Sequence, residues 1–66
     1  MANPKHLKIL KQGVEAWNKW REEYPHVVPE LSSVDMQGAN LRGVNFASAR
    51  LYKANLKKVN LHGAEL

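Results

Sequence analysis

Histidine and serine are two residue types of this chain that could bind a metal or act as a catalytic nucleophile, whereas cysteine is absent. His6, His26 and His62 are not spaced like the ligands of known zinc motifs and are interpreted as solvated or locally bonded. The serines lie near no histidine-and-acid grouping typical of a catalytic triad. The sequence therefore predicts no catalytic, metal or cofactor site, no small-molecule substrate and no enzymatic activity.

Basic side chains in the C-terminal half could contact phosphate groups. The candidates are Arg42, Arg50, Lys53, Lys57 and Lys58. The net charge of +4 is compatible with nucleic acid or an anionic membrane. However, the excess of basic residues is shared equally by residues 1–28 and 29–66, as on an ordinary solvated surface. Phosphate binding is therefore the second hypothesis for the function.

The stretch WNKWR, residues 17–21, combines tryptophan with arginine, and both are typical anchors of protein interfaces. The interpretation preferred from the sequence is that it forms the packing face of a helix, with the Arg21 guanidinium on nearby carbonyl groups. Asn18 and Arg21 are the best candidates for fixing this helix to the rest of the chain.

Apolar residues in the N-terminal third recur at spacings of three and four, which is typical of one helix face. The face contains Leu7, Leu10, Val14, Trp17, Trp20 and Tyr24. Asn3 can cap the N-terminus and Pro4 suits the first helical position, while Pro25 ends the helix. The sequence predicts one amphipathic helix from about Pro4 to Tyr24, with Gly13 as a weak point in its interior.

From residue 29 onward a period of five replaces the helical period. Large apolar residues stand at Leu31, Met36, Leu41, Phe46, Leu51, Leu56, Leu61 and Leu66. Two residues before each of the last seven there is an alanine or a valine. This pattern predicts a structural repeat with two inward-facing side chains and one turn in every unit.

The segments GANLR, KANLK and HGAEL make this region similar to the pentapeptide repeat proteins. The resemblance implies a mainly β fold, namely a short right-handed quadrilateral β-helix, or solenoid, with four pentapeptides in each turn. The chain is then divided into a capping helix and linker at residues 1–28 and about two coils of repeats at residues 29–66.

Residues twenty apart should stack if four pentapeptides make one turn. This register predicts that Glu30 lies beside Arg50 and that Asn40 lies beside Asn60. Two coils are few for a stacked-repeat protein, so the apolar face of the helix is expected to cover the first coil.

The second coil has no such cover, and its end is the predicted interaction site. The residues expected there are Leu51, Leu56, Leu61 and Leu66. The first hypothesis is a cytoplasmic interaction or capping module that docks through this end onto another protein or onto a second copy of itself, most simply as a head-to-head homodimer. The alternative is a basic surface that binds nucleic acid or an anionic membrane.

Overall fold

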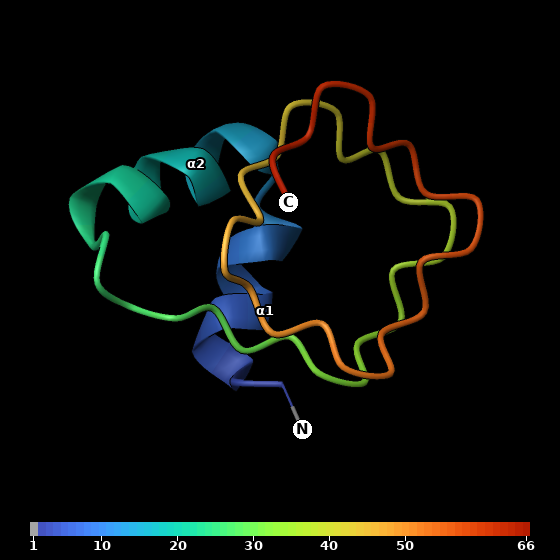
Figure 1. Cartoon of the computed structure of the whole chain (residues 1–66), viewed down its shortest axis with the longest axis horizontal. Coiled ribbons are helices and arrows are strands. Elements are labelled where there is room, and N and C mark those ends of the chain that lie inside the picture. The colour runs from blue at the N-terminus through green and yellow to red at the C-terminus, as the bar shows by residue number, and fades with distance from the viewer. Residues whose placement is uncertain (1) are drawn as a thin grey trace.

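The N-terminal third of the chain forms two helices instead of one. The computed structural model describes residues 2–66 and contains α1, Pro4–Lys11, and α2, Val14–Glu23 (Figure 1). The prediction of a single helix is wrong because Gly13 adopts a φ of 116°, a conformation that is accessible mainly to glycine. The predicted N-terminus of α1 is confirmed, since the Asn3 side chain accepts a hydrogen bond from the Lys5 N–H at 2.9 Å.

The prediction of a mainly β fold is wrong. Across residues 2–66 the structure contains two helices and no β-strand or sheet, and the β-pairing between the repeats is limited to four isolated parallel β-bridges. The physical reason lies in the length of the repeat. After a single bridged residue the backbone enters the next turn, so no segment stays extended long enough to form a strand.

The predicted register of the repeats is confirmed. Residues 29–48 are here called the first coil and residues 49–66 the second coil. The two coils stack and follow the same path in Figure 1, where the second coil lies in front. The bridges join Glu30 to Arg50, Asp35 to Asn55, Asn40 to Asn60 and Asn45 to Glu65. The Arg50 Nε lies 3.2 Å from a carboxylate oxygen of Glu30, which is the stacked pair that the sequence predicts.

Each repeat contains a tight turn of the same kind. In the first, the Val34 N–H donates to the Leu31 carbonyl at 3.3 Å, and Ser33 between them has a positive φ. A positive φ at the third turn position defines a type II turn. The equivalent left-handed residues recur every five positions, at Ser33, Gly38, Gly43, Ser48, Lys53, Lys58 and Gly63.

Polar side chains before the large apolar residue support these turns. The Asn55 Oδ1 accepts a hydrogen bond from the Lys57 N–H at 3.1 Å, two residues further along the chain. The same bond forms from the side chains of Glu30, Asp35, Asn40, Asn45 and Asn60. This Asx-turn geometry explains why Asn or Asp is the usual residue in that place of the repeat.

The left-handed positions predict opposite effects of two substitutions. Replacing Lys53 with glycine should raise the free energy of unfolding by about 0.5–1 kcal/mol, because a left-handed conformation costs a non-glycine residue about 1–2 kcal/mol. Replacing Gly38 with alanine should lower it by about 1 kcal/mol, although no atom lies within 4 Å of the added Cβ. Urea denaturation checks both values. A destabilised Lys53→Gly variant would contradict this account of the turns.

The hydrophobic core lies between the helices and the first coil. Trp17, Leu31 and Val44 are fully buried, and Phe46 packs edge-on against the Trp17 ring at 5.6 Å between centroids. The inward side chains of the second coil are only partly buried, and that of Leu66 is exposed. The core is therefore closed at the helix side and open at the other side. In the described part of the chain, neither helix is long and apolar enough to cross a membrane.

Candidate functional site

The helices bind backbone groups at the edge of the first coil that faces them, here called the upper rim. Trp17 donates its Nε1–H to the Asn45 carbonyl at 2.8 Å. Asn18 accepts the Asn45 N–H at 2.8 Å and donates to the Gly43 carbonyl at 3.0 Å. These side chains of α2 take the hydrogen-bonding role that a preceding coil would have at this position.

Arg21 completes this part of the cap. Its guanidinium donates to the Ala47 carbonyl at 2.8 Å and to the Asn45 carbonyl at 3.4 Å, while its Nε has no hydrogen-bond partner. The side chain is buried although it is charged. The prediction that Asn18 and Arg21 fix the helix to the first coil is therefore confirmed.

His6, on α1, caps a second part of the upper rim, at Glu30. Its Nδ1 accepts the Glu30 N–H at 2.9 Å, and the Asn3 N–H donates to the Glu30 carbonyl at 2.9 Å. Because Nδ1 is the acceptor, the neutral ring carries its proton on Nε2. Burial lowers the pKa of His6 below that of a free imidazole, and the negative charge of Glu30 opposes this by a smaller amount.

The lowered pKa of His6 predicts a loss of stability in mild acid. The unfolded chain takes up a proton at its ordinary pKa of about 6.5, whereas the folded chain resists protonation, so the free energy of unfolding should fall as the pH drops below about 7. The variant His6→Gln should lack this component, while His62→Gln, at an exposed position, should keep it. Denaturation curves between pH 7 and 5 measure the difference. Equal pH dependence in the two variants would contradict the role of His6.

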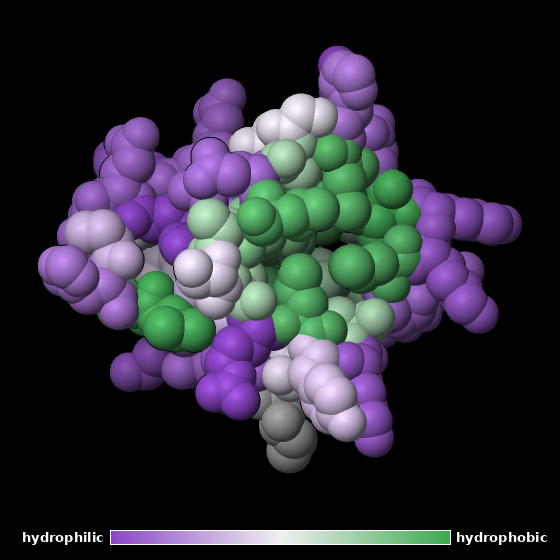
Figure 2. Space-filling view, viewed as in Figure 1, coloured by the Kyte–Doolittle hydropathy of each residue, from purple (hydrophilic) through white to green (hydrophobic). Residues whose placement is uncertain are grey.

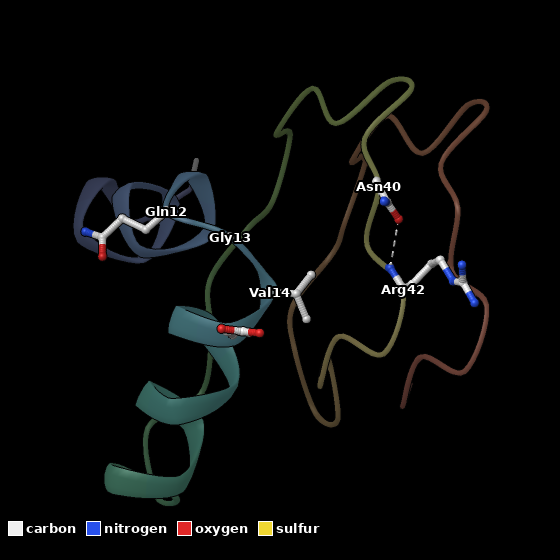
Figure 3. Close-up of a pocket in the computed structure, with 6 residues that line it drawn as sticks. Gln12, Gly13, Val14, Asn40 and Arg42 are labelled. Carbon is white, nitrogen blue, oxygen red and sulfur yellow. Dashed lines mark hydrogen bonds between the residues drawn. The ribbon is translucent and has the colours of Figure 1, made fainter.

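The remaining two sides of the upper rim are not covered by the helices. Across residues 2–66, the N–H groups of Asp35 and Asn40 have no hydrogen-bond partner. A hollow of about 490 Å³ lies between the junction of the helices and this part of the first coil. In Figure 3, Val14 points toward the coil, and Asn40 and Arg42 lie on the first coil opposite the helix junction. The cap is therefore one-sided.

The structure places most of the predicted helix-face residues against the core. Trp17 and Leu10 are buried, and three more are partly buried against the core, namely Leu7, Val14 and Trp20. Tyr24 is 53% exposed. It follows the last residue of α2 with a non-helical φ of −129°, so the helical periodicity does not apply to it.

The inward side chains of the second coil form an apolar surface on the side away from the helices, here called the lower face. Its large residues are the four predicted interaction residues, Leu51, Leu56, Leu61 and Leu66. Leu66 is 75% exposed, whereas Phe46, its counterpart in the first coil, is 2% exposed. Figure 2 shows this face as a hydrophobic area surrounded by hydrophilic side chains.

The predicted phosphate contacts do not form a single stripe. By the twenty-residue register, Arg42, Lys53 and Lys57 belong to three different columns of turns. Lys58 follows Lys57 in its turn, and Arg50 is engaged by the Glu30 carboxylate. The structure thus distributes these five basic side chains around the coils.

No group of three acidic, histidine or cysteine side chains that could hold a metal ion is present in residues 2–66. His6 is bonded to the backbone of Glu30, and His26 and His62 are exposed. The capping role of His6 was missed in the sequence, because its partner lies 24 residues away and no local pattern marks such a contact.

Comparison with known protein families identifies the repeat region. The family model described as pentapeptide repeats matches residues 30–66, with eight copies of the unit. The match covers more than half of the chain. No curated protein and no solved structure matches the chain.

Proposed function

Because the chain belongs to the pentapeptide repeat family, we propose that it is a non-enzymatic interaction module that docks a protein on the lower face of its second coil. The observation that carries the proposal is the contrast between the two coils. Residues equivalent in the repeat are buried beneath the helices in the first coil and are partly or largely exposed in the second. Contiguous exposed apolar surfaces of this kind are typical of protein-binding sites.

The helices support a docking role for the lower face because they cover part of the opposite end. Trp17, Asn18 and Arg21 occupy one part of the upper rim, and His6 occupies another. A partner that needs both apolar surface and free backbone groups finds them together on the second coil. We therefore place the docking site at the lower face and assign the helices a structural role.

Association of the chain with itself gives a direct test. We expect the mean mass in sedimentation equilibrium to rise with concentration in the upper part of a range of about 10 μM to 1 mM. The variant Leu66→Lys should abolish the rise, because it places a charge on the lower face at a side chain already 75% exposed. Tyr52→Lys is the matched control, since Tyr52 is 71% exposed.

If the wild type and both variants are monomeric at every concentration, docking on a second copy is contradicted. The proposed function as a whole fails if, in addition, the face does not accept the coil described in the next subsection. A basic surface for nucleic acid or anionic membranes is the alternative, supported by the net charge of +4 alone. Gel shift and liposome flotation at low salt test it, since such binding depends steeply on salt.

A further inference from the structure

The hydrogen bonds between the two coils are unequally divided. Seven run from N–H groups of the first coil to carbonyls of the second, at Leu31, Ser33, Met36, Gly38, Leu41, Gly43 and Phe46. Four run in the opposite direction, from the N–H groups of Arg50, Asn55, Asn60 and Glu65. A coil in this fold therefore presents mainly donors to the coil that follows it and mainly acceptors to the coil that precedes it.

The second coil repeats this pattern at its free edge, here called the lower rim. By the twenty-residue register its donors are the N–H groups of Leu51, Lys53, Leu56, Lys58, Leu61, Gly63 and Leu66. Its acceptors are the carbonyls of Ala49, Ala54, Val59 and Ala64. None of these groups has a hydrogen-bond partner within residues 2–66. The lower rim is thus rich in donors.

The helical cap follows the same polarity at the upper rim. The carbonyls of Glu30, Asn45 and Ala47 accept hydrogen bonds from Asn3, Trp17 and Arg21. The cap therefore donates more hydrogen bonds to this rim than it accepts. In the described residues it accepts two, from the N–H groups of Glu30 and Asn45. An occupant of the lower rim must have the opposite character and bring carbonyl groups.

We propose that the occupant of the lower face is a pentapeptide coil whose upper rim carries no helical cap. This inference rests on the proposed docking function and names its partner. The acceptor-rich upper rim of such a coil can pair with all seven donors and all four acceptors of the lower rim, as the first two coils do with each other. An unpaired N–H group that becomes buried in an interface is costly, so this match selects the partner.

A second copy of this chain fits less well in either orientation. Two lower rims facing each other bring fourteen donors against eight acceptors and leave at least six N–H groups unpaired. In the head-to-tail orientation the upper rim of the copy is already occupied by His6, Trp17 and Arg21. Self-association through this face should therefore be weak.

Charge defines the partner further. Lys53, Lys57 and Lys58 are exposed at turns of the second coil. If the partner coil continues the twenty-residue register, its turn side chains stack directly on these lysines, as Glu30 stacks on Arg50. Acidic side chains at the turns of the partner coil are expected to favour docking, although each exposed pair contributes little.

The test extends the full chain by a copy of its own first coil that lacks the helices. Residues 27–46 are appended after Leu66, with alanine and serine in place of Val27 and Val28, as at Ala47 and Ser48, because the second of these positions is left-handed. Alanine replaces Pro29 so that the turn can form its N–H bond. We expect the amide exchange of Leu56 and Leu61 to slow by about tenfold or more, and the urea midpoint to rise. A chain with the same twenty residues in scrambled order is the control.

The outcomes separate this inference from the proposed function. If amide exchange is slower in the extended chain than in the original chain, and is not slowed in the scrambled chain, the result supports a pentapeptide coil as the occupant. Equal exchange in both chains overturns it. If exchange is equal but Leu66→Lys still abolishes self-association of the original chain, the lower face docks protein of another kind and only the inference fails. If neither effect occurs, the proposed function fails as well.

Discussion

The variant Trp17→Ala is expected to lose about 3–5 kcal/mol of stability, which is the usual cost of truncating a fully buried aromatic residue. A chain of 66 residues has a total stability of only about 3–10 kcal/mol on the per-residue scale of globular proteins. The variant should therefore lose a large share of the total stability. Far-UV circular dichroism with urea titration measures the loss.

Two controls separate the contributions of Trp17. The variant Trp17→Phe keeps much of the contact with Phe46 but lacks the hydrogen bond to the Asn45 carbonyl, so it should fall between the wild type and Trp17→Ala. Tyr24→Ala removes an aromatic residue that is 53% exposed and should change stability by less than about 1 kcal/mol. If Trp17→Ala is no less stable than Tyr24→Ala, the helices do not hold the first coil in the way described.

The repeat register could be predicted from the sequence because it depends on a local device. Every unit repeats one turn, and the position of the large apolar residue fixes where the turn falls. The pairing of Glu30 with Arg50 then follows from counting twenty residues. The low content of regular β-structure also follows from the turns, but the family resemblance led to the expectation of a mainly β fold, which the structure corrects.

The division of the helical segment was harder to predict. Hydrophobic spacing runs through Gly13 without interruption, so the pattern shows a single face where the backbone makes two helices. The sequence identifies Gly13 as a weak point of a helix, but it does not show that the backbone adopts a φ of 116° there and ends the helix. The break allows α1 to reach Glu30 through His6 and α2 to reach Asn45 through Trp17.

The candidate docking site was predictable in part. Its apolar residues follow from the five-residue period, whereas the donor-rich character of the lower rim does not. Which N–H groups point toward the next coil depends on the turn conformation, and the amides of Leu41 and Gly43 show this direction only in the structure. Hydrogen-bond polarity is a property of the backbone path and leaves no mark on side-chain composition.

The variant Arg21→Met should lower the free energy of unfolding by about 2 kcal/mol. It removes the charge-assisted hydrogen bonds to the carbonyls of Ala47 and Asn45, each contributing about 1.5–3 kcal/mol. Part of this loss is offset, because the variant also removes a buried charge and the Arg21 Nε that lacks a partner. Asn45 still accepts from Trp17, so Ala47 is the carbonyl left without a partner.

Two further variants distinguish the bonds of Arg21 from its charge. Arg21→Lys keeps the charge but cannot reach both carbonyls with a planar fork, so it should recover only part of the lost stability. Arg42→Met removes an arginine at an exposed turn and should lie within about 0.5 kcal/mol of the wild type. Urea denaturation of all three variants gives the comparison. Full recovery of stability in Arg21→Lys would mean that the positive charge alone, and not the hydrogen bonds to both rim carbonyls, stabilises this contact.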